Sequence, residues 1–477
     1  MIDAIAPAWA RNLGRGLALL LIVGGLVSLP TTSARGQQPD DQANGEVDQD
    51  APIDGEMTPE KQDQQDVLAD SIYVDPVAAS IMRGRYDQLH STVLVPPNTD
   101  RTIAQMARGG TRLDAGLIDR FIKYAARQLT DHDNINAVMS GGQQSRIQSI
   151  EDAGKYLALP YAEVPANQRD RRFLQEFNSR LLALAPELLK NHLYARVQVM
   201  QALSRIGDPV ALSLLIEQLR NPEQPLIVKQ LAAEGVRRIA VEAGDSLSTA
   251  DRENAANALV EFLRDNPEAY WLSHTRALQA LGTLRRISGV ENRDQAVFAN
   301  ELLAVLSSAD QRPESRAWAA WALGMLEVPP NYPQLNFSLA AYQVGTLAVE
   351  IGQRIVDLSD PRELEAYNPE RVKYLTALIV APVFSSLDGA PELRGSGLRN
   401  TRGLGPHQQY VVRVHQLIRQ LAVASVELTN ARGAQITGAR DRVIGRLNEL
   451  RTFLNENRPE DGTFISGGRE FALQDAS

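Results

Sequence analysis

Histidines and carboxylates are the side chains of this sequence that could do chemistry, and their spacing limits what that chemistry can be. His132 stands between Asp131 and Asp133, so an imidazole and two carboxylates are available to a metal ion. The competing interpretation is a solvated helix end, the commoner state of such a triplet without further ligands. No two histidines show the i, i+4 spacing of a helical zinc motif; they are His90, His132, His192, His274, His407 and His415.

A basic, glycine-rich loop at residues 394–405 is the most unusual local feature. Its backbone N–H groups and guanidinium charges could cradle an anion. The loop lacks the Gly-Lys-Ser/Thr ending of a phosphate-binding loop, and no strand precedes it, so a flexible surface loop is the competing interpretation. The residues concerned are Arg394, Gly395, Ser396, Gly397, Arg399, Arg402, Gly403 and Gly405.

Tryptophans form the third candidate site. Trp318 and Trp321 are three residues apart, so they share one helix face, and they could stack on a sugar or grip a partner peptide. Ordinary packing against a neighbouring helical hairpin explains them as well, because a helix that is apolar on all sides is normally buried.

Other catalytic patterns are missing from the sequence. The chain has no cysteine, which excludes disulfides, thiolate nucleophiles and Cys-based metal sites. A Gly-x-Ser-x-Gly nucleophile elbow is absent, and the carboxylates are too numerous to pair by linear order. The sequence therefore predicts no catalytic, cofactor-binding or metal-ligating residue, and no cofactor.

Composition and charge favour an all-α fold. Of the 477 residues, 44% are hydrophobic but only 5% aromatic, which suits helices packed through Ala and Leu better than a β-sandwich. The net charge of −9 is uneven: residues 1–36 carry +2, residues 37–70 carry −10, and the rest is close to neutral at −1. We therefore expect no nucleic-acid partner, which would need a strongly basic face.

The first 66 residues have the composition of a targeting segment and a linker. Arg11 and Arg15 precede an apolar run from Leu17 to Leu29 and a small-residue exit, which predicts a secretory signal peptide over residues 1–36. An uncleaved membrane anchor is the alternative, although a spanning helix needs roughly 20 apolar residues. The acidic stretch 37–66 is predicted to be a disordered linker. We expect export, a periplasmic or cell-envelope location, and no membrane span after cleavage.

A repeat in the middle of the chain is the most specific signal. One helical stripe of small and large apolar residues, at i, i+3, i+4 and i+7, recurs four times with offsets of 33, 45 and 42 residues. Its members are Val199, Ala202, Leu203 and Ile206; Ala232, Gly235, Val236 and Ile239; Ala277, Ala280, Leu281 and Leu284; Ala319, Ala322, Leu323 and Leu326. Stacked hairpins would bury these stripes against one another.

Capping signals open the helices between and beside these stripes. Asp208-Pro209 predicts a helix through Leu219, and Ser248 predicts one through Phe262. A third helix is predicted through Ala299–Leu306, and Arg312-Pro313-Glu314 opens the fourth stripe.

Residues 196–219, with their Ile-Gly-Asp-Pro turn, resemble the HEAT repeat family, including the bilin-lyase-type HEAT-like repeats. Ala280-Leu281-Gly282 and Ala322-Leu323-Gly324 echo the end of that family's first helix. The resemblance covers about residues 190–330 and implies an α-solenoid, although the second unit lacks Gly-Asp-Pro and has an insertion at 241–248. The resemblance also suggests bilin-lyase activity. That chemistry takes place in the cytosol, and export would remove the protein from it.

Helical regions are predicted on both sides of the repeats. Residues 67–189 should contain helices at about 76–83, 114–129, 143–157 and 169–188, and residues 331–457 helices at about 334–356, 369–387, 407–430 and 436–455. Residues 458–477 are predicted to be a frayed tail.

Two functions are compatible with this organisation. The first is a non-enzymatic scaffold in the cell envelope that binds a protein or peptide partner through the solenoid surface, as the HEAT-like resemblance implies. The alternative is an all-helical protein that binds or degrades envelope polysaccharide, for which Trp271, Trp318 and Trp321 would supply the platform. Partner identity and oligomeric state are not encoded in any motif.

Overall fold

The computed structural model describes residues 75–140, 142–289, 295–330, 332, 335–360, 368–391, 393–459, 463–466 and 469–473. The chain divides into two units, Met1–Asp66 and Val67–Ser477, and the described residues all belong to the second. The signal peptide predicted at residues 1–36, the linker predicted at 37–66 and residues 67–74 lie outside them.

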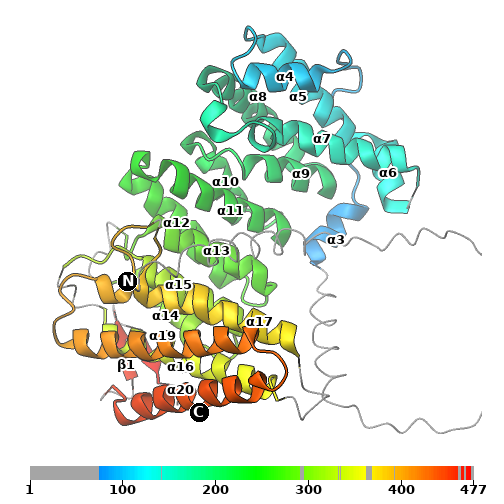
Figure 1. Ribbon diagram of the computed structural model, residues 1–477. Helices are drawn as coiled ribbons and strands as arrows, with labels where there is room; N and C mark the ends of the chain where they lie inside the picture. The colour runs from blue at the N-terminus through cyan, green and yellow to red at the C-terminus, as the bar shows by residue number, and fades with distance from the viewer. Residues whose placement is uncertain are drawn as a thin grey trace, which may run out of the picture. The chain divides into compact units, whose positions relative to one another are not determined.

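Helices dominate the described part, which is an all-α solenoid as predicted (Figure 1). Its first third contains six helices, two of which, α4 and α6, the sequence does not predict. Their bounds are α3 (Pro76–Arg83), α4 (Thr99–Ala107), α5 (Ala115–Thr130), α6 (His132–Ser140), α7 (Gln144–Ala162) and α8 (Arg171–Leu189).

The repeat region forms two rows of helices. The first row contains α9 (Leu193–Leu203), α11 (Leu226–Ala243), α13 (Trp271–Leu284) and α15 (Pro313–Met325), each packed on the next. The second row contains α10 (Leu212–Arg220), α12 (Thr249–Asp265) and α14 (Val297–Ser307). Ser248 caps α12 as predicted, since its Oγ accepts from Asp251 N at 3.0 Å. Asp208 caps the 3-10 helix Pro209–Ala211 that leads into α10, and its Oδ1 accepts from Val210 N at 3.0 Å. Helix α10 packs more closely on α11, which follows it in the chain, than on α9, from which the Gly-Asp-Pro turn separates it.

All four predicted stripes point into one continuous core. Every member is buried, including Ile206, which lies beyond the last turn of α9, and Leu326, which caps α15. Gly235 shows why the small positions matter, because a Cβ there would lie 2.8 Å from Leu215 Cδ1. The stripes therefore nest because their small residues admit side chains of the facing helices.

A terminal bundle closes the array. It contains α16 (Phe337–Asp357), α17 (Pro369–Leu378), α18 (Phe384–Asp388), α19 (Gln408–Asn430) and α20 (Gln435–Glu456). Helix α16 packs against both α19 and α20, which lie at the opposite end of the described body from α4, α5 and α8 (Figure 1).

Two predicted elements differ from the structure. The helix expected at 369–387 is interrupted by a π-helical segment, Ile379–Val383, because Pro382 has no N–H to donate and its ring clashes with the preceding turn. Within the stretch predicted to be a frayed tail, β1 (Thr463–Ser466) pairs antiparallel with β2 (Arg469–Ala472) in a hairpin.

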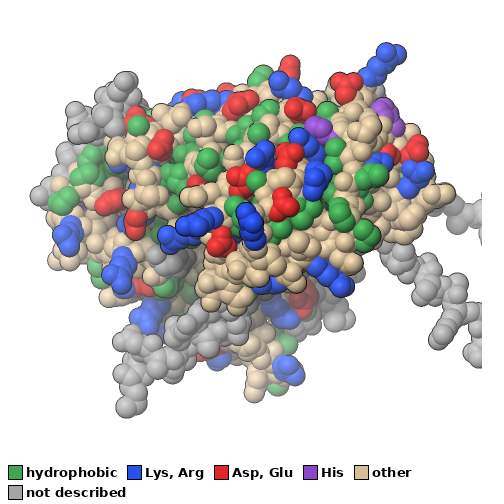
Figure 2. All heavy atoms as spheres, turned by 90° about the horizontal axis from the view of Figure 1, so that it is seen from above, with side chains coloured by type: hydrophobic (Ala, Val, Ile, Leu, Met, Phe, Trp, Pro, Cys, Tyr) green, Lys and Arg blue, Asp and Glu red, His purple; other side chains and the backbone are tan. Residues whose placement is uncertain are grey.

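The surface of the described body is mixed in charge. Figure 2 looks onto the end at which α4, α5 and α8 lie, and on that face Lys and Arg side chains alternate with Asp and Glu side chains and with apolar ones. Among the helices within the described ranges, none combines the length and the apolar character needed to cross a bilayer.

Candidate functional site

The first row presents a charged cluster between α11 and α13. Glu234 accepts two hydrogen bonds from Arg237, at 2.9 and 2.6 Å, and lies 3.7 Å from Arg276 of the next helix. Burial acts to raise the pKa of Glu234, but the hydrogen bond and charge of Arg237, together with Arg276, outweigh it and hold that pKa below its usual range. A carboxylate held ionised in this way is suited to structural pairing rather than to proton transfer.

Trp318 and Trp321 lie one layer further along the same row. Their rings meet edge to face, 5.6 Å between centroids and 69° between planes. Trp321 lies over Gly282 of α13, where an added Cβ would be 2.7 Å from its Cζ3 atom. Both indoles are partly exposed, so they pack between layers and also contribute apolar area to the surface of the first row.

Arg312 connects Trp271 with a buried carboxylate. The Arg312 guanidinium stacks on the Trp271 ring, 5.9 Å from its centroid, and also lies 3.5 Å from Glu314. Glu314 is only 2% exposed and accepts a hydrogen bond from the Tyr374 hydroxyl at 3.2 Å. Burial and the Glu314 charge raise the pKa of Tyr374 above its usual range. This carboxylate therefore joins α15 to α17.

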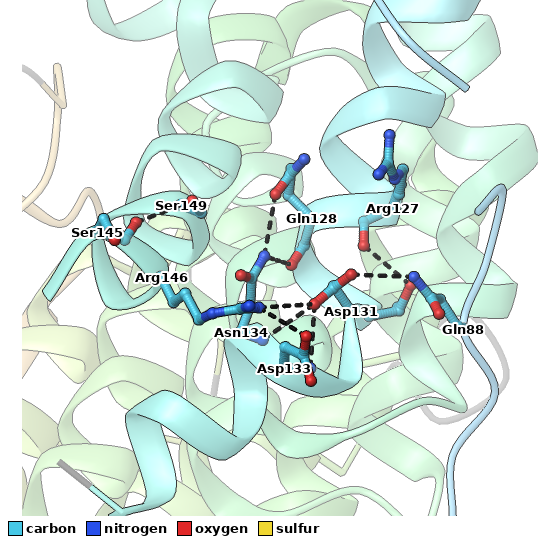
Figure 3. A network of polar contacts seen from close by, with 10 residues as sticks. Gln88, Arg127, Gln128, Asp131, Asp133, Asn134, Ser145, Arg146 and Ser149 are labelled. Atoms are coloured by element: carbon cyan, nitrogen blue, oxygen red, sulfur yellow. Dashed lines mark hydrogen bonds and ion pairs between the residues drawn. The ribbon is translucent and has the colours of Figure 1, made fainter. Parts of the chain in front are cut away.

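The aspartates on either side of His132 are engaged in helix capping and ion pairing (Figure 3). Asp131 Oδ1 accepts from the backbone N–H groups of Asp133 and Asn134, both at 3.0 Å, which caps α6. Asp133 pairs with Arg146 at 2.9 Å, and the His132 ring stacks on Tyr86 at 4.7 Å. The arrangement is that of a helix N-terminus fixed to its neighbours.

The glycine-rich loop is anchored through its middle. Gly397 N donates to Gly324 O, at 2.6 Å, at the end of α15, and a Cβ on Gly397 would lie 2.4 Å from Gly389 N. Ser396 Oγ accepts from Ala390 N at 2.8 Å. The φ of Gly397, +93°, also restricts this position to glycine. These glycines permit close backbone approach, whereas Arg394 and Arg402 at the loop's edges are exposed.

A histidine–carboxylate contact fixes the same loop to α19. Asp388 Oδ1 accepts from His415 Nε2 at 3.0 Å and pairs with Arg399 of the loop at 2.6 Å. The hydrogen bond from His415 and the Arg399 charge hold the pKa of Asp388 below its usual range. His415 is 3% exposed and stacks on Phe384 at 5.1 Å, so it links α18 to α19.

The remaining histidines lie apart from one another. His192 caps α9 through Tyr194 N, and burial lowers its pKa. His274 Nε2 lies 2.7 Å from Asn266 O, and His407 Nδ1 lies 2.8 Å from Ser338 Oγ. Within the described ranges, His, Asp and Glu side chains nowhere gather in a group of three or more that could hold a metal ion.

A groove between α19 and α20 is the feature that the sequence did not reveal. Two adjoining hollows, of about 420 and 600 Å³, share Glu427 and Arg442 in their linings. Val423, 54% exposed, lies in the first hollow and Gly438 in the second. An exposed valine and a glycine in the first turn of α20 were the available signals, but each is unremarkable in a sequence.

Comparison with known proteins identifies the repeat. Residues 195–221, which span α9 and α10, match the PBS lyase HEAT-like repeat family. No curated protein and no solved structure gives a significant match to the chain. The match covers one repeat unit, and the stripe of that unit recurs in the helices of the first row through α15.

Proposed function

We propose that this chain is a non-enzymatic protein–protein interaction scaffold of the cell envelope, and that it binds a protein or peptide partner through its solenoid surface. The observation that carries the proposal is the partly exposed face of the first row, where Glu234, Arg276, Trp318 and Trp321 lie on consecutive helices. HEAT-like arrays commonly serve as platforms for partner binding, since stacked units create one extended surface.

The roles of the chemically capable side chains support the proposal. The carboxylates beside the tryptophans are ion-paired, and those around His132 cap a helix or pair with arginine. These groups serve in helix capping and in ion pairs, which are structural roles.

The location is proposed on the sequence alone. The positively charged start, the apolar run and the small-residue exit support export across the inner membrane, with removal of residues 1–36. Mass determination of the mature N-terminus would test this, and a retained residue 1 would contradict it.

Affinity capture from an envelope extract tests the binding role. The full chain should recover a defined partner, and a double substitution of exposed apolar residues on α11, Ile227→Glu with Val241→Glu, should reduce that recovery. These side chains are 38% and 56% exposed, so the substitutions should leave the thermal midpoint unchanged, because surface changes usually cost within about 0.5 kcal/mol.

A matched control keeps the result specific. Val210→Glu introduces one carboxylate at a valine outside α11 that is as exposed as Val241, and it should leave recovery unchanged. Recovery of no protein above background by the unaltered chain would contradict the scaffold proposal, as would equal recovery by all three proteins.

A further inference from the structure

The groove between α19 and α20 combines a few apolar side chains with amide side chains and several arginines. Val423 and Ala424 of α19 line its first hollow with Arg419 and Arg446, and Gly438 of α20 lines the second. Val423 is 54% exposed and lies on the face of α19 that borders the groove.

The rest of the array shows what a glycine on a helix face does in this chain. Gly352 of α16 receives Leu447, whose Cδ1 would be 3.0 Å from an added Cβ, and Gly282 receives Trp321 in the same way. On the outer face of α20, by contrast, the nearest atom to a Cβ on Gly438 is the Arg442 guanidinium at 4.0 Å. Gly438 thus leaves open a space of the kind that Leu447 occupies at Gly352 and Trp321 at Gly282.

Charge defines the partner that fits this space. Between Gln408 and Glu456 the sequence has seven Arg and no Lys against four Asp or Glu, in a body that is otherwise close to neutral. Arg442 pairs with Glu427 at 2.9 Å and Arg446 with Glu449 at 2.8 Å. Arg419 makes neither a hydrogen bond nor an ion pair within the described residues. The rim is therefore net positive and favours an acidic partner.

We propose that the α19–α20 groove is the docking site for an amphipathic helix of a partner protein, whose apolar stripe meets Val423 and Gly438 and whose flanking carboxylates meet Arg419 and Arg446. The helix continues the packing of the array by one further layer, and its acidic edges set its orientation. The inference rests on the proposed scaffold function and adds to the first-row face a second binding surface with a stated partner chemistry.

A synthetic acidic amphipathic peptide tests the groove directly. The labelled probe carries Leu at i, i+3, i+4 and i+7 with Glu at the flanking positions, and fluorescence anisotropy measures its binding to the full chain. We expect saturable binding that weakens about tenfold or more when salt is raised from about 0.02 to 0.3 M, because screening acts on exposed charges. A peptide with Lys in place of Glu should bind at least tenfold more weakly.

Substitutions at the groove separate specific docking from general attraction. Gly438→Leu fills the hollow and should weaken probe binding at least tenfold, while the fold is retained because open space surrounds that position. Arg419→Glu with Arg446→Glu should weaken it similarly. Gly445→Ala is the matched control on the same helix: nothing lies within 4 Å of its Cβ, it is not among the groove residues, and binding should be unchanged.

The outcomes of the two experiments are distinguishable. No binding of the acidic probe, or equal binding by the Gly438→Leu protein, would overturn the groove inference while leaving capture from an envelope extract as the test of the scaffold. Binding of the Lys peptide as tightly as the Glu peptide would overturn the assigned partner chemistry.

Discussion

Gly324→Ala is a substitution for which the geometry predicts a large loss of stability. Gly324 lies in the last turn of α15, where that helix meets the backbone of α18. A Cβ at this position would lie 2.0 Å from the Ser386 carbonyl oxygen and 2.6 Å from the Ser386 Cα. Because both obstructing atoms belong to backbone, no side-chain rotation relieves the clash.

The magnitude follows from two opposing terms. Real Cβ atoms rarely approach another heavy atom below 3.0 Å, so α15 and α18 must separate by about 1 Å, and overpacking of this kind costs up to ~3 kcal/mol. Replacing glycine by alanine within a helix returns ~0.5–1 kcal/mol. The net expectation is a loss of ~2 kcal/mol. Gly445→Ala, which meets nothing within 4 Å, should gain ~0.5–1 kcal/mol.

Urea unfolding followed by far-UV circular dichroism measures both variants, with amide hydrogen exchange of α15 and α18 as the local readout. Gly324→Ala should unfold at lower urea concentration than the unaltered chain, and Gly445→Ala at equal or higher concentration. A Gly324→Ala protein as stable as the Gly445→Ala protein would refute the close approach of α15 and α18.

Three further predictions concern individual contacts. Asp75 accepts from N–H groups of α3 and, at 2.6 Å, from Leu226 N at the start of α11, so Asp75→Ala should cost ~1–2 kcal/mol and remove hydrogen-exchange protection from α3. Asp388→Asn tests the contact with His415. The pKa of Asp388 is lowered in the folded state. The stabilisation that the ionised Asp388 contributes is therefore complete above the ordinary aspartate pKa of about 3.9, and it is lost as pH falls through the lowered pKa. The stability difference between the unaltered chain and Asp388→Asn should therefore be constant near neutrality and shrink in acid; a constant difference at all pH values would contradict it. His132→Phe keeps the ring stacking and should change stability by less than about 0.5 kcal/mol, and zinc should shift the thermal midpoint of neither protein.

The stripes were predictable because their residue pattern depends only on which face of a helix is buried. Small and large apolar residues at i, i+3, i+4 and i+7 identify the face of a helix that must be covered, whatever covers it. That is why Ile206 and Leu326 are buried as expected although both lie outside the regular helix. The caps at Asp208 and Ser248 were predictable for the same reason, since they depend on neighbouring residues only.

Features that depend on which distant segments meet were not predictable. The glycine-rich loop reads as flexible in the sequence, but Gly397 donates to Gly324 across the fold and thereby fixes the loop. The groove depends on α19 and α20 lying side by side, which places Val423 and Gly438 on one surface. Neither Val423 nor Gly438 reveals this shared surface in the sequence, because an exposed valine or a helical glycine has many local explanations.

Coupling between layers tests the central claim, that nested stripes make the repeat region one continuous array. Gly282→Ala places a Cβ 2.8 Å from Ala322 Cα and disturbs the contact between α13 and α15. Native-state hydrogen exchange should then show lower protection in α11 and α15 as well as in α13, because each unit is stabilised by its neighbours. Loss of protection confined to α13, with α11 and α15 unchanged, would contradict the account.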